Sequence, residues 1–347
     1  MTIIDPRQLV PLGRTALRVP RVGIGLRPIG DFAPERAEDA RAVVRSAIAR
    51  RVTLFDTAPA YGYGQSERRL GEVIRERGRD DLVIATKVGQ IPEPISFARK
   101  AALVLRESAS SPRAMVTGAA QAARVLTRLA RRAPLGPQAV IAHAYREKDV
   151  FRSVEASLER LATDHLDIAF VHDPDDDYEE ALGHAWPALR RLRAEGAIRA
   201  IGVAMNQAPM LARFIRDTDV DVVLVAGRYT LLDRSAADEL LPLALGRGVG
   251  VLVGSVFHGG LLADPHEGAI FEQRRATAEE VGRARRFEAI CRRHGTSLRA
   301  AAMAFPLLHP AVTSVLIGVT SPSELDGNLA ALDTVLPHAM WEELERA

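Results

Sequence analysis

Short apolar runs alternate along this chain with longer segments in which apolar residues recur at helical spacing. The runs hold four to six residues, most of them β-branched, aromatic or leucine. They are too short for helices, so they predict buried strands. The eight predicted strands are 22–26, 52–55, 82–85, 166–171, 200–203, 222–225, 249–253 and 313–317.

The segments between these runs predict helices. In residues 37–49, Ala40, Val43, Val44 and Ala47 fall on one helical face. The same pattern predicts helices at 150–161, 179–194, 208–216, 235–247, 280–293 and 297–307. Ser66 has the type and position of an N-cap for a further helix after the strand 52–55. Eight alternating strands and helices predict an α/β fold, a closed (β/α)8 TIM barrel.

Two segments depart from this repeat. A small hairpin is predicted around Gly13-Arg14, ahead of the first barrel strand. After the third strand, residues 88–148 form an insert within what we take as one barrel domain, 1–347. Residues 114–133 of the insert predict a basic amphipathic helix, and residues 88–150 carry a net charge of +6. This helix could be solvated and packed on the barrel, a lid or funnel for an anionic substrate group, or a membrane-surface element.

Composition narrows the class of partner. The chain has 347 residues, 47% of them hydrophobic, and a net charge of only +2, so we expect a large core and small-molecule substrates rather than nucleic acid or a membrane. Its single cysteine, Cys291, cannot form an internal disulfide. The first residues lack a signal peptide, and no apolar run reaches roughly 18 residues. A cytoplasmic location is expected.

Reactive side chains follow several predicted strands. Asp56 and Tyr61 come after 52–55, Lys87 after 82–85, and His172 after 166–171. Singly, such residues are often a helix cap, core or solvated surface. In a (β/α)8 barrel, however, the carboxyl ends of all strands meet at one face, where active sites are built. The acidic run 173–177 lacks the glycine and spaced glutamate of a calcium loop and predicts a turn instead.

The order of these motifs resembles the aldo/keto reductase superfamily. The motifs are Asp56-Thr57-Ala58, Tyr61-Gly62, Thr86-Lys87 and Val171-His172-Asp173-Pro174, and the likeness runs from Leu12 to about Leu332. Within this superfamily, four sequence segments are similar to those of the branch of aldose and pyridoxal dehydrogenases. They are residues 55–71, 167–176, 200–207 and 226–233.

The resemblance implies that Tyr61 is the acid/base of a tetrad with Asp56, Lys87 and His172. We expect the Lys87 ammonium to lower the pKa of Tyr61, and Asp56 to pair with Lys87. His172 would donate a hydrogen bond to the substrate oxygen. His143 and Tyr145, near the end of the insert, either line the substrate site or belong to a second hairpin.

No G-x-G-x-x-G fingerprint opens a strand–turn–helix unit. The resemblance instead implies NAD or NADP across the barrel mouth. The implied positions are Asn206 for the nicotinamide carboxamide, Ser255 for the pyrophosphate, Gly318, Thr320 and Ser321 beside the adenosine, and Asn328 for the adenine.

Departures from the family pattern modify the expected cofactor contacts. NADP-specific members carry a Lys and an Arg where this chain has Gly318 and Glu324. A carboxylate there would repel a 2′-phosphate, so NAD is expected to be preferred, with NADP possible. Gly254 replaces an aromatic residue that stacks on the nicotinamide, and Phe257 either takes that place or packs in the core.

The expected activity is NAD-dependent oxidation of a sugar-like hemiacetal at its anomeric carbon to a lactone, or of a related alcohol. One alternative is an NADPH-dependent reductase of aldehydes or ketones. Another is a dinucleotide-binding regulatory subunit with little turnover, for which the basic insert is the one sequence feature.

Overall fold

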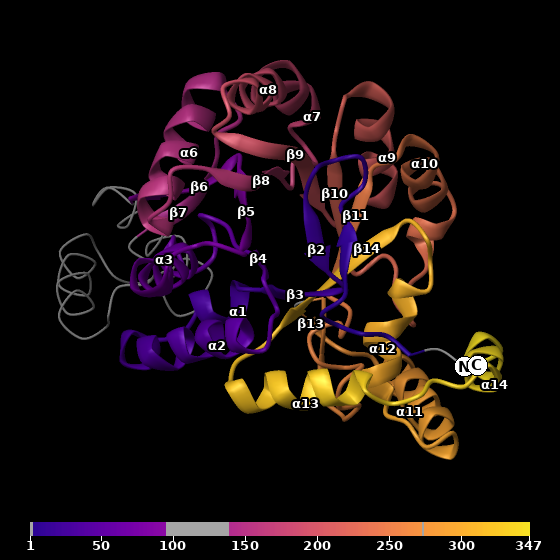
Figure 1. Cartoon of the computed structure of the whole chain (residues 1–347). Coiled ribbons are helices and arrows are strands. Elements are labelled where there is room, and N and C mark those ends of the chain that lie inside the picture. Colours follow the sequence, from indigo (N-terminus) through magenta and orange to yellow (C-terminus); the bar gives the residue numbers. More distant parts are fainter. Residues whose placement is uncertain (1–2, 95–138, 273) are drawn as a thin grey trace, which may run out of the picture.

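The computed structural model describes residues 3–94, 139–272 and 274–347, and its centre is a closed barrel of eight parallel strands ringed by helices (Figure 1). The last strand pairs with the first, which closes the sheet. The fold predicted from the apolar runs is therefore confirmed. In barrel order the strands are β3 (Val22–Gly25), β4 (Leu54–Asp56), β5 (Val83–Val88), β8 (Leu166–His172), β9 (Ile198–Met205), β10 (Val222–Ala226), β11 (Gly250–Gly254) and β14 (Val312–Gly318).

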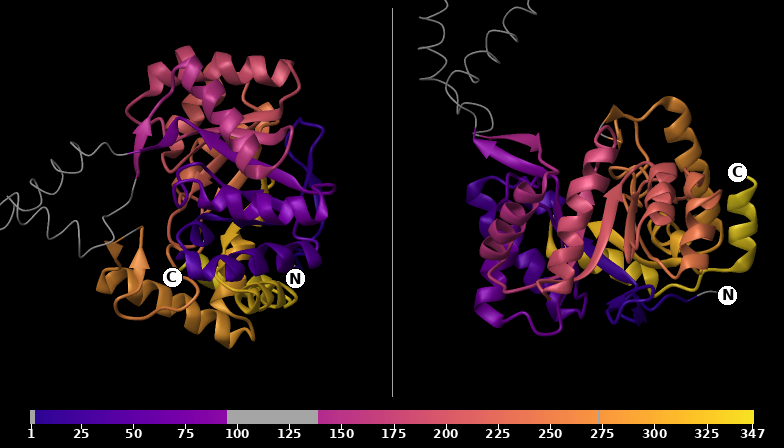
Figure 2. Two further views of the ribbon diagram at one scale, coloured as in Figure 1. Left: turned by 90° about the vertical axis from the view of Figure 1, so that its left-hand side faces the viewer. Right: turned by 90° about the horizontal axis from the view of Figure 1, so that it is seen from above.

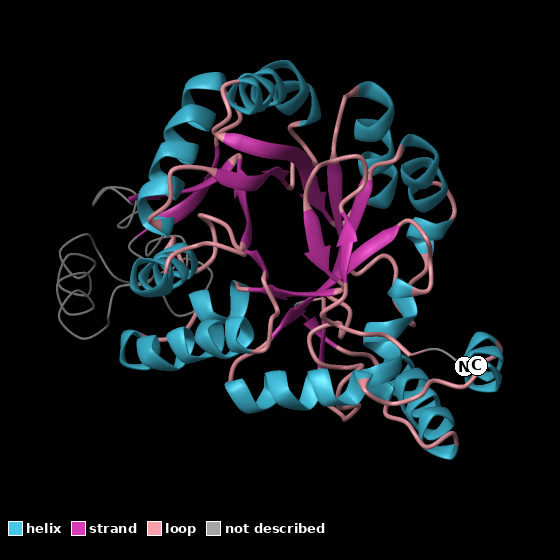
Figure 3. Cartoon of the chain, in the orientation of Figure 1, coloured by secondary structure: helices cyan, strands magenta, loops and turns pink. Residues whose placement is uncertain are grey.

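Helices cover the outside of this sheet (Figure 3). Alternate strand residues face opposite ways, so each strand contributes to two apolar cores. Leu54, Ile168 and Leu252 belong to the barrel interior, whereas Phe55 and Ala169 pack in the layer beneath the helices. The main helices are α2 (Ala37–Ala49), α3 (Gln65–Arg77), α6 (Glu147–Leu161), α8 (Trp186–Ala194), α9 (Ala208–Asp217), α10 (Leu240–Arg247), α11 (Ala278–Arg293), α12 (Leu298–Leu307), α13 (Pro322–Leu332) and α14 (His338–Glu345).

Several predicted boundaries are wrong. The strand expected at 82–85 continues through Thr86 and Lys87 to Val88. The helix expected at 179–194 contains α7 (Tyr178–Glu180) and the π-helical turn η2 (Ala181–Ala185) ahead of α8. The helix expected at 235–247 is split into a short 3₁₀ turn, η3 (Ser235–Ala237), and α10.

Ser66 is not an N-cap. The cap residue of α3 is Gly64, and Ser66 lies buried inside the first turn. Its hydroxyl accepts from Thr57 Oγ1 at 2.7 Å and donates to the Leu26 carbonyl at 3.0 Å. The polar side chain that suggested a cap is thus used to join α3 to the ends of β3 and β4.

The two ends of the barrel carry different hairpins (Figure 2). At one end the predicted N-terminal hairpin, β1 (Leu9–Pro11) and β2 (Arg18–Pro20), packs Leu12 against the barrel interior. At the opposite end, which we call the mouth, stand β6 (Gln90–Pro94) paired with β7 (Ala139–His143), and β12 (Ile270–Phe271) paired with β13 (Arg274–Arg275). The strands present their carboxyl ends at this mouth.

The β6–β7 pair is the described part of the insert. His143 lies in this hairpin, in agreement with the second of the two expectations for that residue. The predicted basic helix at 114–133 lies outside the described residues. Over the described residues, we find no helix with both the length and the apolar character needed to span a membrane.

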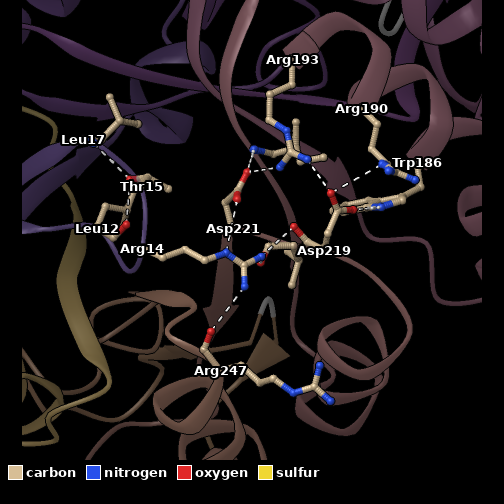
Figure 4. A network of polar contacts seen from close by, with 12 residues as sticks. Leu12, Arg14, Thr15, Leu17, Trp186, Arg190, Arg193, Asp219, Asp221 and Arg247 are labelled. Atoms are coloured by element: carbon tan, nitrogen blue, oxygen red, sulfur yellow. Dashed lines mark hydrogen bonds and ion pairs between the residues drawn. The ribbon is translucent and has the colours of Figure 1, made fainter.

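A network of ion pairs ties the N-terminal hairpin to the strand starts (Figure 4). Asp221, just before β10, accepts from Arg193 Nη1 at 2.6 Å and from the Ile201 amide at 3.0 Å. Arg14 in the hairpin donates to the carbonyls of Asp219 and Val220, each at 2.9 Å. The network lies far from the mouth, so we expect it to affect stability rather than chemistry.

Replacing Asp221 with alanine is expected to lower the free energy of unfolding by about 1–3 kcal/mol, because Arg193 and the Ile201 amide both lose an acceptor. Urea denaturation measures this loss. The matched control is Arg190→Ala, whose side chain is 61% exposed and 3.5 Å from Asp219, so its loss should stay within about 0.5 kcal/mol. Equal losses in the two variants would contradict the role given to Asp221.

Candidate active site

An ion pair between neighbouring strands lies at the mouth. β4 and β5 pair in parallel, with Asp56, the last residue of β4, opposite Ala85 and two residues before the level of Lys87. Lys87 Nζ donates to Asp56 Oδ1 at 2.7 Å, to Oδ2 at 2.8 Å and to the Thr57 carbonyl at 2.9 Å. Burial lowers the pKa of the Lys87 ammonium, but Asp56 and Tyr61 together outweigh this effect, so the pKa is raised. The pairing expected from the sequence is therefore present, with a charged lysine.

Tyr61 lies over this pair. Lys87 Nζ is 4.6 Å from the centre of the Tyr61 ring, and the ring is edge-on to His172 with 6.0 Å between centres. The structure therefore brings Asp56, Tyr61, Lys87 and His172 together.

The expected pKa shift of Tyr61 has the wrong sign. Burial raises the pKa of Tyr61, and the Lys87 ammonium only partly opposes this increase. The physical reason is that Asp56 neutralises much of the lysine's field, so desolvation of a phenolate dominates. Tyr61 thus holds its proton at neutral pH in the free protein.

The Tyr61 loop is locked to the short helix α1 (Arg27–Gly30), which the sequence did not predict. A Cβ built on Gly30 would lie 2.9 Å from the Tyr61 carbonyl carbon, and one built on Gly62 would lie 2.0 Å from the Gly30 oxygen. Gly62 also has φ +57°. Glycine at both positions therefore allows the two backbones to touch.

Arg69 fixes α1 from the other side. This buried arginine of α3 donates to the carbonyls of Ile29 and Gly30, and to that of Phe32 at 2.7 Å. Sequence reasoning missed Arg69, although its spacing from Ser66 and Val73 places it on the buried face of α3. An arginine on the buried face of a helix must have hydrogen-bond acceptors nearby, and this could have indicated its role from the sequence.

His172 is the last residue of β8 and is buried. Burial, followed by the charges of Lys87 and Arg27, holds the pKa of His172 well below its usual value, so the imidazole is neutral. Its Nδ1 is buried and has no hydrogen-bond partner among the described residues. Its Nε2 lies 3.5 Å from Asp173 Oδ2.

Tyr145 holds the backbone at His172. The buried phenol donates to the carbonyl of His172 at 2.7 Å and to that of Asp173 at 2.9 Å, where Asp173 has φ +40°. Its ring packs against Gly89, where a Cβ would lie 2.0 Å from Cε1. Tyr145 therefore supports the site from within the core, and its hydroxyl is not a lining group.

The residues considered for a dinucleotide lie on the other side of the mouth. Ser255 follows β11, is exposed and has φ +56°. Gly318 ends β14 and is exposed, close to Pro28. Asn206, after β9, is exposed, and its carbonyl accepts from Arg228 Nε at 2.9 Å. Phe257 packs against the core, which favours the second of its two expected roles.

The other four residues considered for the dinucleotide lie in or just before helix α13. They are Thr320, Ser321, Glu324 and Asn328. Ser321 is the N-cap and accepts from the Glu324 amide at 3.1 Å. Glu324 Oε2 accepts from the Thr320 amide and hydroxyl, each at 2.8 Å. Asn328 is buried, and its Nδ2 has no partner among the described residues. This unmet amide donor suits the ring nitrogens of an adenine, so these residues fit the implied dinucleotide.

No described part of the chain gathers three or more His, Cys, Asp or Glu side chains in a manner that could hold a metal ion. Residues 173–177 form a bend in which the Asp177 amide donates to the Pro174 carbonyl at 3.2 Å, so the turn expected from the sequence is present.

A sequence model described as the Aldo/keto reductase family matches residues 21–347. The chain belongs to the aldo/keto reductase family. It is 34% identical to D-threo-aldose 1-dehydrogenase of a Pseudomonas species, over 95% of this chain and 94% of that one. It is also 34% identical to pyridoxal 4-dehydrogenase of Microbacterium luteolum, over 96% of this chain and 95% of the relative.

A solved structure of glycerol dehydrogenase from Gluconobacter oxydans superposes with a TM-score of 0.73 at 19% identity, over 98% of this chain and 94% of that one. This likeness concerns the fold. Family membership makes the protein a nicotinamide-dinucleotide-dependent oxidoreductase that acts on CH–OH or carbonyl groups of small molecules.

Proposed function

We propose that this aldo/keto reductase uses NAD to oxidise a sugar-like hemiacetal at its anomeric carbon, giving a lactone, with Tyr61 as the acid/base. The observation that supports it most is the meeting of Tyr61 and His172 over the Lys87–Asp56 pair at the barrel mouth. The 34% identical relatives are named as an aldose dehydrogenase and a pyridoxal dehydrogenase, which supports the oxidation of a hydroxyl or hemiacetal.

Each side chain has a role that follows from its surroundings. The neutral imidazole of His172 donates a hydrogen bond to the substrate oxygen and orients the carbon. Lys87 stabilises the phenolate form of Tyr61, whose Oη accepts the hydroxyl proton and so becomes the neutral phenol. Asp56 keeps the ammonium in place. A dinucleotide would supply the hydride acceptor. The residues that would hold it are Asn206, Ser255, Gly318, Thr320, Ser321, Glu324 and Asn328.

The direct test is an assay with purified protein, NAD and a panel of L-fucose, D-arabinose and pyridoxal. Formation of NADH, followed by absorbance, is the expected result. A protein that binds NAD but forms no NADH with any member of the panel would remove the proposed substrate class.

The rate of oxidation is expected to rise with pH toward about pH 10, because the raised pKa of Tyr61 leaves few phenolates at neutral pH. The rate of carbonyl reduction, which needs the protonated phenol, should fall over the same range. Initial rates in both directions from pH 6 to about pH 10.5 measure this. Oxidation that is flat across the range would exclude Tyr61 as the base.

The protonated state of Tyr61 also favours a second candidate, an NADPH-dependent reductase of aldehydes or ketones. Comparing kcat/KM for NADH and NADPH with a simple aldehyde separates this activity from the first. Among the described residues, no feature of the site supports the third alternative, a dinucleotide-binding regulatory subunit with little turnover.

Glu324 is the residue proposed to favour NAD over NADP. Replacing it with glutamine is expected to improve kcat/KM for NADP about 10-fold, because a carboxylate no longer repels the 2′-phosphate. The value for NAD should change less than about 3-fold. The control is Glu345→Gln, an exposed carboxylate at the end of α14. An unchanged NADP/NAD ratio would mean that Glu324 only stabilises the turn at Thr320.

A further inference from the structure

The backbone at Arg27 is fixed to the reactive end of β4. The Leu26 amide donates to the Asp56 carbonyl at 2.8 Å, and the Leu26 carbonyl accepts from Ser66 Oγ at 3.0 Å. Arg27 follows directly as the first residue of α1. Its position is therefore set by contacts to the residues on either side of the Tyr61 loop.

Arg27 also lies beside the predicted cofactor loop. A Cβ built on Gly318 would lie 3.0 Å from Cγ of Pro28, the next residue after Arg27. The other end of α1 touches Tyr61 through Gly30 and is held by Arg69. Arg27 thus stands at the mouth, between the residue proposed as acid/base and the loop proposed to hold the dinucleotide.

The guanidinium of Arg27 has no partner among the described residues. Arginines that follow it in the chain are paired on the outside of the barrel: Arg36 with Asp39 at 2.9 Å, Arg41 with Glu72 at 2.7 Å and Arg45 with Glu76 at 2.8 Å. Arg27 is exposed and forms no hydrogen bond or ion pair to the described chain. An unpaired arginine held on a rigid support is available to a ligand.

The charge of Arg27 acts on groups of the reaction centre. It contributes to lowering the pKa of His172 and opposes the rise in the pKa values of Tyr61 and Asp173. The other cation close to these groups, Lys87, has its charge offset by Asp56. Among the described residues of the mouth, Arg27 is therefore a positive charge that acts on the proposed tetrad and on Asp173 without forming an ion pair with either.

We infer that Arg27 is a specificity residue that binds an anionic group, a carboxylate or a phosphate, carried by the substrate. This inference rests on the proposed function and names the class of substrate. A guanidinium binds either group through two parallel hydrogen bonds, which also fixes the orientation of the molecule. The substrate is then an acidic sugar or a phosphorylated alcohol or aldehyde rather than a neutral one.

The test uses compounds that share the same hemiacetal and differ in an anionic substituent. D-galacturonate carries a carboxylate and D-galactose 6-phosphate a phosphate, and each is paired with neutral D-galactose. For each pair, kcat/KM is measured for the wild type, for Arg27→Gln and for the control Arg36→Gln, an exposed arginine paired with Asp39. The charged-to-neutral ratio is expected to fall about 10- to 100-fold in Arg27→Gln and to stay within about 2-fold in the control. The pair that shows the fall identifies the anionic group.

A binding measurement separates this inference from the proposed function. Calorimetry with NADH-saturated proteins that also carry Tyr61→Phe, which stops turnover, gives the dissociation constants of the same compounds, and the same fall in ratio is expected. An unchanged ratio by both methods would overturn the role of Arg27, whether or not the compounds are oxidised. If the dissociation constant of NADH changes instead, Arg27 binds the phosphates of the dinucleotide. That result would also overturn the inference that Arg27 binds the substrate. Oxidation of none of the compounds, with the binding ratio still altered, would count against the proposed function alone.

Discussion

Replacing Tyr61 with phenylalanine is expected to lower kcat for oxidation by about 10³-fold or more, while the dissociation constant for the dinucleotide changes less than about 3-fold. The change removes only the hydroxyl that is proposed to exchange a proton with the substrate. The ring keeps its contacts with Lys87 and with His172. Rates from NADH absorbance and binding by calorimetry, both at the pH of maximal wild-type activity, measure the two effects.

The matched control is Tyr63→Phe. Tyr63 lies two residues away in the same loop, and 38% of it is exposed. The Tyr63 hydroxyl should contribute little to catalysis, so we expect the kcat of Tyr63→Phe to stay within about 2-fold of the wild type. If Tyr61→Phe retained turnover comparable to that of the control, another group would have to be the acid/base.

The second large effect is expected for Lys87→Met. Removing the ammonium leaves the Asp56 carboxylate buried without its partner, which should lower the free energy of unfolding by about 3–5 kcal/mol. The phenolate of Tyr61 also loses its stabilising charge, so kcat for oxidation should fall by at least about 10²-fold. Urea denaturation and initial rates measure the two losses separately.

A double variant distinguishes the two consequences. In Asp56→Asn/Lys87→Met no charge remains buried at this position, so most of the lost stability should return. Activity should not return, because no cation faces Tyr61. If the double variant is as unstable as Lys87→Met alone, the instability comes from lost packing of the lysine stem rather than from an unpaired carboxylate.

The barrel could be predicted from the sequence because of how parallel strands are buried. Both faces of such a strand are covered, so each appears as an uninterrupted apolar run such as 222–225, and eight runs separated by helical segments leave few other folds. The same geometry gathers residues at the strand ends, which is why Asp56, Lys87 and His172 could be placed together without coordinates.

The rest of the site depends on contacts between distant parts of the chain. Arg69 and the carbonyl of Ile29 are 40 residues apart, and nothing local to either residue predicts their hydrogen bond. The direction of the Tyr61 pKa shift also required the structure, because it is set by a balance between burial and a lysine charge that Asp56 partly cancels. Ser66 illustrates the opposite error, in which a local rule gave a helix cap and the tertiary contact prevailed.

The order of strands around the barrel has a consequence for how this enzyme can be altered. Asp56, Lys87 and His172 come from three successive strands, β4, β5 and β8, whereas the residues proposed to hold the dinucleotide follow β9, β11 and β14. The residues proposed for proton transfer and those proposed for coenzyme choice therefore lie on separate sets of neighbouring strands around the barrel. Substitutions that exchange one coenzyme for another should combine additively with substitutions among the acid–base residues, so each property can be selected independently in directed evolution.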